Sequence, residues 1–303
     1  MKLKFDVKGR SQADPFIFAD GSDFYLYVTG EKGVEMYKTN DIFGLWNYKG
    51  IVCSVDGGYD YWAPSVIKIK DKYYMYFSFV GKAGFERLHV SCAYSPEGPF
   101  ENPKQLYGEF SIDPHMVKTK SGLFLFYAKN NEDADLKGTR VYVDKFLDPF
   151  TPENNPKEVI LPSFNQEKYA PNCIPDGDWY TIEGPFWFCD GKRQYIMYSG
   201  GCYLDDTYHI GFAYANTDAT DLKTVEFIKH TNGGKFAPVL AKNTLEEGTG
   251  HNSLIAIDGK YYAVYHARDY NSDGTRNPDN PRSARICELK IENGKITIKN
   301  KSL

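Results

Sequence analysis

A hairpin pattern recurs five times along the chain and constrains its fold more than any other feature of the sequence. Each copy consists of a short strand, a tight turn and a strand rich in aromatic residues, which is the signature of a β-hairpin. The copies read DPFIFADGSDFYLYVT, APSVIKIKDKYYMYFS, DPHMVKTKSGLFLFYA, EGPFWFCDGKRQYIMYS and HNSLIAIDGKYYAVYHA. The second strand starts ten residues after the head of each copy, or eleven in the fourth, so the five heads occupy equivalent positions.

Further strands follow the hairpins, and they complete the pattern of a known all-β architecture. Runs such as GVEMYKT, RLHVSCAYS and HIGFAYANT alternate in the manner of strands, and long helical periodicity is hard to find. A hairpin with one or two outer strands, repeated at about 50 to 70 residues, is typical of a β-propeller blade. Because one hairpin cannot bury both of its faces, the blades must stack around an axis. We predict a five-bladed β-propeller, with residues 1–303 as a single domain.

Composition argues against two classes of partner. The net charge of -4 comes without a block of Lys and Arg, so the chain has no footprint for binding nucleic acid. No run of about 18 apolar residues is present that could cross a bilayer, and none of signal-peptide length begins the sequence. The six scattered cysteines form no metal-binding spacing and read as reduced thiols. We therefore expect a cytoplasmic protein without nucleic-acid or membrane partners.

The heads of the five hairpins carry the candidate catalytic groups. They are Asp14, Ala63, Asp113, Glu183 and His251. In a propeller the first strand of each blade runs along the central channel, so its first residues share one mouth of that channel. A single Asp before Pro is most often a turn residue. Three carboxylates and an imidazole share one narrow channel, where the like charges of the carboxylates raise one another's pKa at a cost in stability, and this favours a functional site.

Residues near the heads are candidates for binding a substrate. Trp62 could offer a flat apolar face to a sugar ring, although core packing would also explain an indole there. Phe16 and Phe186 lie just past two heads and share this ambiguity, and His115 lies on the channel face by the two-residue period of a strand. Arg285 enters the last strand and is either a cation for the pocket or a surface residue.

Two carboxylates that face each other across an open pocket suit the hydrolysis of glycosides. The sequence has neither a phosphate-binding glycine loop nor a recognisable Ser-His arrangement that would favour another reaction. A base that is ionised and an acid that is protonated at the same pH need different environments. A third carboxylate near the acid would raise the pKa of that acid and keep its proton available.

The motifs at the heads resemble those of glycoside hydrolase family 43, the five-bladed enzymes that degrade arabinan and xylan. The motifs are ADPF at 13–16, YWAPSV at 61–66, IDPHM at 112–116, EGPF at 183–186, and TGHNS at 249–253 followed by YHAR. Each motif is weak alone, but five in order at blade spacing are specific, and they span the chain from Ala13 to about Arg285. Ser65 departs from the pattern, because an acidic residue is frequent there in relatives, and this puts substrate contacts in doubt.

The resemblance implies a division of roles. Asp14 would be the general base that activates water, Glu183 the general acid, and Asp113 the residue that tunes and orients Glu183, with inversion of configuration. An inverting pair leaves room for water, so the two carboxyl groups should lie roughly 6.5 to 9.5 Å apart. The resemblance also implies a calcium ion in the channel, held by His251 and waters; one imidazole is a thin ligand set for such a cation, so the reaction would require no cofactor.

The GHNS and YHAR ending and the compact length look most like exo-acting α-L-arabinofuranosidases. The expected partner is therefore an arabino-oligosaccharide derived from arabinan or arabinoxylan, with xylo-oligosaccharides as the other candidate. A β-xylosidase or an endo-arabinanase of the same family remains open. Two readings without catalysis also remain, a sugar-binding propeller and a protein scaffold, although neither needs three carboxylates at equivalent heads.

Overall fold

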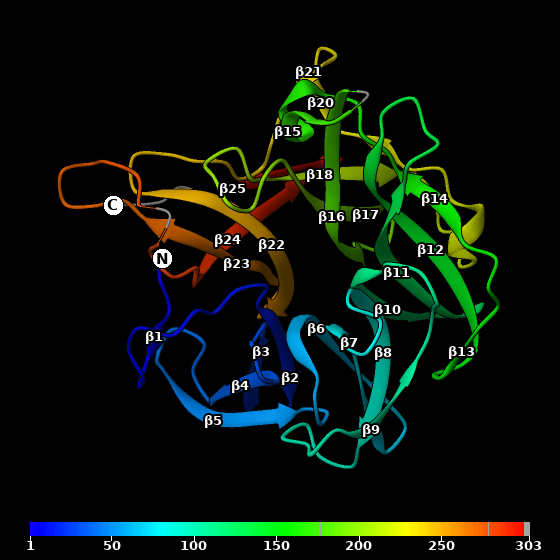
Figure 1. The fold of residues 1–303 in the computed structure, drawn as a ribbon, viewed down its shortest axis with the longest axis vertical. Coiled ribbons are helices and arrows are strands. Elements are labelled where there is room, and N and C mark those ends of the chain that lie inside the picture. Colours follow the sequence, from blue (N-terminus) through cyan, green and yellow to red (C-terminus); the bar gives the residue numbers. More distant parts are fainter. Residues whose placement is uncertain (176, 278, 300–303) are drawn as a thin grey trace.

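Strands in the computed structural model fall into five successive antiparallel groups (Figure 1). A short parallel pairing of Gly138 and Thr139 with Tyr180 and Thr181 joins the third group to the fourth. The structure describes residues 1–175, 177–277 and 279–299. The first group contains β2 (Phe16–Asp20), β3 (Asp23–Val28), β4 (Val34–Thr39) and β5 (Leu45–Cys53). The second contains β6 (Tyr59–Ile69), β7 (Lys72–Val80), β8 (Glu86–Ala93) and β9 (Glu101–Gln105). The third contains β10 (Ile112–Thr119), β11 (Gly122–Asn131) and β12 (Gly138–Asp148).

The fourth and fifth groups continue the same order. The fourth contains β16 (Gly177–Cys189), β17 (Gln194–Gly200), β18 (His209–Ala215) and β19 (Ile228–Lys229). The fifth contains β22 (Glu246–Ile257), β23 (Lys260–Asp269), β24 (Ser283–Glu292) and β25 (Lys295–Ile298). Shorter elements are β1 (Lys4–Phe5), β13 (Thr151–Pro152), β14 (Lys157–Ile160), β15 (Lys168–Ile174), β20 (Thr231–Asn232), β21 (Lys235–Phe236), η1 (Asn165–Glu167) and η2 (Leu222–Thr224). Neither short helix in the described part of the chain could span a membrane.

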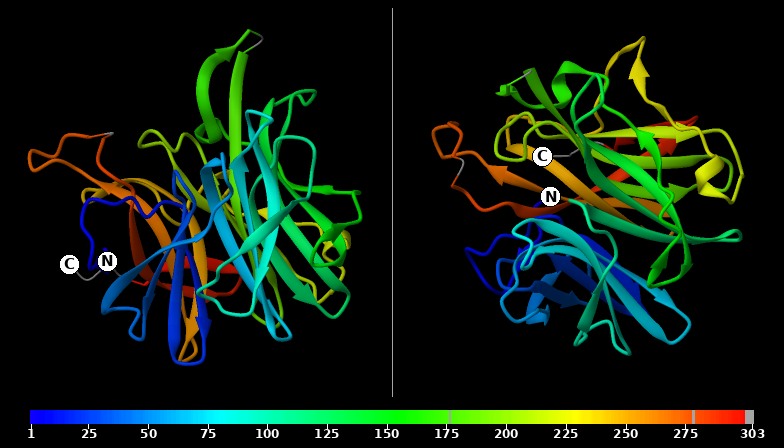
Figure 2. Two further views of the ribbon diagram at one scale, coloured as in Figure 1. Left: turned by 60° about the horizontal axis from the view of Figure 1, so that its bottom comes forward. Right: turned by 45° about the vertical axis from the view of Figure 1, so that its right-hand side comes forward.

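The first strands of the groups form a closed ring. β2 contacts β6, β6 contacts β10, β10 contacts β16, β16 contacts β22, and β22 returns to β2. Figures 1 and 2 show the later strands of each group lying outside this ring. The prediction of an all-β propeller is confirmed, and we interpret the five groups as its blades. Each of the five hairpins in the sequence forms the inner pair of one group.

The hydrophobic core lies between neighbouring blades because alternate residues of a strand face opposite ways. On β7, Met75 and Phe77 pack in a cluster with Tyr27 of the first blade. Tyr76, between them, packs with Leu125 of the third blade. Further clusters join the third blade to the fourth, the fourth to the fifth and the fifth to the first. This two-sided burial explains why the strands read as nearly continuous aromatic and aliphatic runs.

A residue with positive φ lies in or just before the inner strand of every blade. Asp14, Ala63, Asp113, Gly184 and His251 have φ of 51°, 48°, 58°, 58° and 47°, the left-handed region that L residues seldom adopt. Register shifts lie beside the last four of these positions, and such bulges redirect side chains.

The fourth blade departs from the predicted phase. Gly184, not Glu183, is the structural equivalent of the other heads, and Gln194 follows it by ten residues as in the other copies. Glu183 is equivalent to Trp62 instead, since each directly precedes the left-handed residue of its blade. The additional residue that makes the spacing of the fourth copy eleven is therefore at the head of the hairpin.

Amino-terminal residues close the ring. The amide of Leu3 donates to the carbonyl of Ala284 (3.0 Å), and Lys2 forms an antiparallel bridge with Arg285 at the start of β24. The chain then enters β1, which pairs in parallel with β5 of the first blade. Figure 2 shows the N-terminus beside the last blade. The first residues thus join the fifth blade to the first, a closure that the hairpin pattern alone did not reveal.

Candidate active site

A pocket of about 320 Å³ opens where the inner strands begin. It contains all three predicted carboxylates and the predicted histidine. Its lining residues are Asp14, Asp60, Trp62, Ile112, Asp113, Glu183, Tyr203, Tyr208, His251 and Arg282. The left-handed heads therefore bring residues that lie up to 237 positions apart in the sequence into one cavity.

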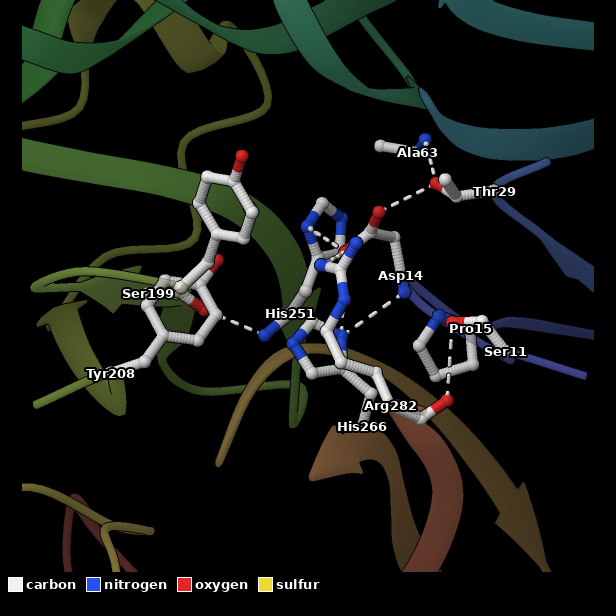
Figure 3. A network of polar contacts seen from close by, with 12 residues as sticks. Ser11, Asp14, Pro15, Thr29, Ala63, Ser199, Tyr208, His251, His266 and Arg282 are labelled. Atoms are coloured by element: carbon white, nitrogen blue, oxygen red, sulfur yellow. Dashed lines mark hydrogen bonds and ion pairs between the residues drawn. The ribbon is translucent and has the colours of Figure 1, made fainter. Parts of the chain in front are cut away.

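Asp14 is buried and surrounded by groups that favour its ionised form. Thr29 Oγ1 donates to Asp14 Oδ2 at 2.5 Å, while Arg282 Nη1 and His266 Nδ1 lie 3.4 and 3.3 Å from Asp14 Oδ1. Figure 3 shows this cluster around the carboxylate. Burial alone would raise the pKa of Asp14, but the charge of the neighbouring Arg282 guanidinium holds that pKa well below its usual value. Asp14 is therefore ionised at neutral pH.

Asp113 and Glu183 have the opposite environment. Burial, followed by the charge of Asp14, raises the pKa of Asp113 to about 8, against a hydrogen bond of 2.8 Å from the Gly184 amide. Burial and the charge of Asp113 raise the pKa of Glu183 to about 8, although the Tyr208 hydroxyl donates to Glu183 Oε1 at 2.7 Å. At neutral pH this pair of carboxyl groups therefore holds at least one proton, whereas Asp14 is ionised. The pocket can thus supply a base and an acid together.

His251 lies between two of the carboxylates. Its Nδ1 is 3.5 Å from Asp14 Oδ1 and 3.7 Å from Asp113 Oδ2, and its amide donates to Ser199 Oγ at 2.7 Å. Burial lowers the pKa of this histidine, so the neutral imidazole is favoured. Calcium requires an oxygen-rich shell, and the described residues contain no group of three or more His, Cys, Asp or Glu side chains arranged to hold a metal. A calcium ion held by His251 would therefore depend on water for most of its ligands, and its presence stays a prediction.

Trp62 and Arg282 form walls of the pocket. Trp62 is half-buried at the blade-two position equivalent to Glu183. The Arg282 guanidinium lies 5.2 Å from the centre of the Tyr203 ring, a distance at which a cation and an aromatic face attract. These side chains combine flat apolar faces with a cation.

Phe16, His115 and Phe186 are placed deeper in the channel and do not line the pocket. The His115 and Phe186 rings stack at 4.1 Å, and Phe16 is 6.2 Å from each ring. Each follows a left-handed head by two residues, so it shares the channel face but sits one layer below. His115 also contacts the carbonyl of Trp187 at 3.1 Å. The structure thus places these three predicted binding residues in a packed layer beneath the site.

Arg285 neither lines the pocket nor lies at the surface, so both alternatives predicted for it are wrong. It is buried on β24, where its guanidinium pairs with Glu246 at 3.3 Å and with Asp269 at 2.6 Å. The cation at the site is Arg282, three residues earlier, directly before β24 begins. Since side chains alternate along a strand, Arg285 points into the interface beside β23 instead.

The hairpin repeat did not single out Thr29, Tyr208 or Arg282, which contact the carboxylates of the site. Thr29 directly follows β3, whereas Tyr208 and Arg282 directly precede β18 and β24. The end of a second strand and the start of a third strand lie at the same mouth as the heads. That connectivity is the signal that could have found these residues.

Comparison with known proteins now decides the family. The sequence profile of glycosyl hydrolases family 43 matches residues 7–296. The chain belongs to this family. The name of the family describes its members as glycosyl hydrolases. The family predicted from the motifs at the heads is therefore confirmed.

Individual relatives are distant. An "Extracellular exo-alpha-(1->5)-L-arabinofuranosidase" of Streptomyces avermitilis is 25% identical over 284 residues, which cover 86% of this chain and 55% of the relative. "Xylosidase/arabinosidase 43A" of Humicola insolens is 23% identical over 262 residues, 78% of this chain and 73% of the relative. A crystal structure of a thermostable family-43 glycoside hydrolase superposes with a TM-score of 0.81 at 26% identity, covering 98% of this chain and 95% of that chain. The chain thus spans about half the length of the Streptomyces relative.

The comparisons contradict the cytoplasmic location expected from the sequence. The Streptomyces avermitilis relative and two further matched relatives are named extracellular enzymes. The expectation was wrong because it depended on segments that the sequence lacks, and such an absence does not show where a protein acts.

Proposed function

We propose that the protein is an exo-acting α-L-arabinofuranosidase that releases arabinose from arabino-oligosaccharides with inversion of configuration. The observation that carries this proposal is the opposite electrostatic environment of two carboxyl groups in one pocket. The pKa of Asp14 is held well below its usual value, whereas that of Glu183 is raised to about 8. General bases and general acids need this difference at a common pH.

In the proposed reaction Asp14 accepts a proton from a water molecule as that water attacks the anomeric carbon. Glu183 gives its proton to the glycosidic oxygen, and the bond between this oxygen and the anomeric carbon breaks. Asp14 then holds one proton and Glu183 has lost one, so proton exchange with solvent resets the site. Inversion requires the two carboxyl groups to lie roughly 6.5 to 9.5 Å apart, which stays a prediction.

Asp113 acts in this scheme through its charge and its hydrogen bond. The Gly184 amide donates to Asp113 Oδ2, and a donor of this kind favours an ionised carboxylate. A negative Asp113 in turn favours the protonated form of Glu183. Because Gly184 directly follows Glu183, the same hydrogen bond fixes the backbone from which the acid projects.

The choice of arabinose rests on the names of relatives, and a neighbouring pocket bears on the length of the substrate. Relatives named as exo-acting arabinofuranosidases support this choice. A second pocket of about 330 Å³ shares Asp60, Trp62 and Arg282 with the first, and it offers space for the leaving-group part of an oligosaccharide. β-Xylosidase activity is the second candidate, because the name of the Humicola insolens relative includes it.

The decisive experiment compares hydrolysis of para-nitrophenyl α-L-arabinofuranoside and β-D-xyloside by the wild type and by Asp14→Ala, Asp113→Asn and Glu183→Gln. We expect the arabinoside to be preferred and each variant to lose about 100-fold or more of kcat, since general acid and base catalysis contribute about 10²- to 10⁴-fold. NMR of the first product formed from arabinobiose should show the inverted anomer.

The outcomes separate the alternatives. A preference for the xyloside would contradict the assignment of arabinose as the substrate and leave the assigned acid and base unchanged. A retained anomer would contradict the assigned mechanism. Folded variants that bind and hydrolyse as the wild type does would contradict the assignment of Asp14 and Glu183 altogether.

A further inference from the structure

Tyr208 contacts the acid of the site from a place outside the hairpin repeat. It directly precedes β18, it is fully buried, and it lines the catalytic pocket. Its hydroxyl donates to Glu183 Oε1 at 2.7 Å. We propose that Tyr208 is the positioning residue of the general acid and determines which oxygen of Glu183 carries the catalytic proton. This inference rests on the proposed function, in which Glu183 is that acid.

The hydrogen bond from Tyr208 occupies one oxygen of the Glu183 carboxyl group and leaves the other oxygen for the acid proton. A tyrosine hydroxyl has one proton to donate, and here that proton is directed at Oε1. A proton on Glu183 is therefore held at Oε2, the other oxygen. Rotation of the carboxyl group would break a buried hydrogen bond and leave the Tyr208 hydroxyl without this partner, which is costly. The acid is thus held in one orientation before substrate arrives.

The ring of Tyr208 is fixed from both sides. The ring lies parallel to that of His266, with an interplanar angle of 11° and centroids 5.7 Å apart. His266 Nδ1 accepts a hydrogen bond from the Asp14 amide at 3.1 Å. On β22, a Cβ built on Gly250 would lie 1.8 Å from the Tyr208 ring. The absence of a side chain at Gly250 therefore leaves room for this ring. The stacked rings of Tyr208 and His266 contact both the acid and the base, Tyr208 through Glu183 and His266 through the amide of Asp14.

The proposed role has a kinetic signature that packing alone would not produce. A donor to Oε1 favours ionised Glu183, so the hydrogen bond from Tyr208 lowers the pKa that burial raises. Removing the hydroxyl should move the alkaline limb of the pH profile of kcat/KM to higher pH. The loss of rate should also depend on the leaving group, because a good leaving group needs little help from an acid.

The test is Tyr208→Phe, assayed with arabinobiose and with 2,4-dinitrophenyl α-L-arabinofuranoside. We expect kcat to fall by about tenfold or more on arabinobiose and by less than about threefold on the activated substrate, with the alkaline limb shifted upward. Tyr76→Phe is the matched control, because Tyr76 is also fully buried and its hydroxyl donates to the Pro149 carbonyl at 2.7 Å, away from the pocket. It should leave both the profile and the leaving-group dependence unchanged.

Equal losses on both substrates with an unmoved alkaline limb would overturn the role of Tyr208. Glu183→Gln distinguishes this from failure of the proposed function: if Glu183→Gln abolishes turnover of arabinobiose but Tyr208→Phe behaves as Tyr76→Phe does, only the present inference is wrong. Gly250→Ala provides a second route if Tyr208→Phe does not fold. It keeps the hydroxyl but displaces the ring, and it should reproduce the same dependence on the leaving group; a uniform loss would again overturn the proposal.

Discussion

Single residues at this site differ in function because their surroundings differ. Asp14 and Asp113 have the same side chain, the same motif and nearly the same φ. Arg282 and His266 lie beside Asp14, whereas Asp113 receives one backbone hydrogen bond and faces the charge of Asp14. Their pKa values therefore move in opposite directions. The residue type marks a candidate, and the neighbours assign its protonation state.

The raised pKa of Glu183 predicts a change of stability with pH. The folded pKa of about 8 exceeds the ordinary value of 4.5, so the stabilising contribution present below about pH 4.5 is lost as the pH rises through about 8. Glu183→Gln does not titrate and should escape this loss. Each pKa unit corresponds to about 1.4 kcal/mol, so a rise from 4.5 to about 8 predicts that the variant gains roughly 4 kcal/mol on the wild type between pH 4.5 and pH 9.

Thermal unfolding of both proteins at the two pH values would measure this gain. Glu101→Gln, a change on exposed strand β9, is the control and should follow the wild type at both values. A difference in Tm between Glu183→Gln and the wild type that is the same at pH 4.5 and pH 9 would show that Glu183 is not buried in its neutral form.

The hairpin period predicted Asp14, Asp113 and His251 as residues of one cavity, and Glu183 only by allowing an extra residue in the fourth copy. The prediction that Phe16, His115 and Phe186 bind substrate failed to place them correctly. The two-residue period of a strand shows which face a residue lies on, but not how deep it lies in the channel. The hairpin period did not predict Arg282, Thr29 and Tyr208. They lie at the ends of strands, where the connection between strands determines their position and no repeat marks them.

At the scale of elements, the connection between β17 and β18 carries side chains that the repeat does not describe. Tyr203 from this connection walls the pocket and Tyr208 at its end contacts Glu183. Residues of the fifth blade hold the connection in place: Arg268 Nη1 donates to the Tyr203 carbonyl at 2.9 Å, and Arg276 donates to the Leu204 carbonyl. One wall of the pocket thus depends on contacts between two blades.

Arg276→Ala should loosen this wall without disturbing the reacting carboxylates. Arg276 is partly exposed, with 34% of its side chain accessible, and it also pairs with Glu247 at 3.4 Å. We expect KM for arabinobiose to rise by about threefold to tenfold, in keeping with a loss of about 1 kcal/mol of binding energy, and kcat to change by less than about twofold. Initial-rate kinetics would measure both constants.

Lys290→Ala is the control for the removal of a cation, since Lys290 pairs with Glu292 at the surface of the fifth blade. It should leave KM unchanged. A fall in kcat for Arg276→Ala with an unchanged KM would mean that the connection acts on the reacting groups and not on the binding of substrate.

At the scale of the whole molecule, a closed ring makes every blade depend on its neighbours. The carboxylates come from the first, third and fourth blades and the imidazoles from the fifth, so a slip between any two blades would separate acid from base. The sequence predicted the number of hairpins because each repeats a local pattern. It did not reveal how the ends meet. Residues 1–5 contact β24 of the fifth blade and β5 of the first blade, and neither contact follows from a local pattern in the sequence.

This closure predicts that Leu3, an apolar residue of the amino-terminal segment, contributes to the stability of the whole ring. Leu3 is 4% exposed and packs in the cluster that joins the fifth blade to the first. Leu3→Ala should cost about 2 to 3 kcal/mol, as buried leucines usually do, and lower Tm by several degrees, while turnover at 20 °C stays near that of the wild type because the site keeps its geometry while folded. Leu147→Ala is the matched control, since Leu147 is 71% exposed. Equal melting temperatures for the two variants would show that the ring is held by its blade interfaces without the amino-terminal segment, and a loss of turnover by folded Leu3→Ala would mean that closure shapes the pocket as well as stabilising it.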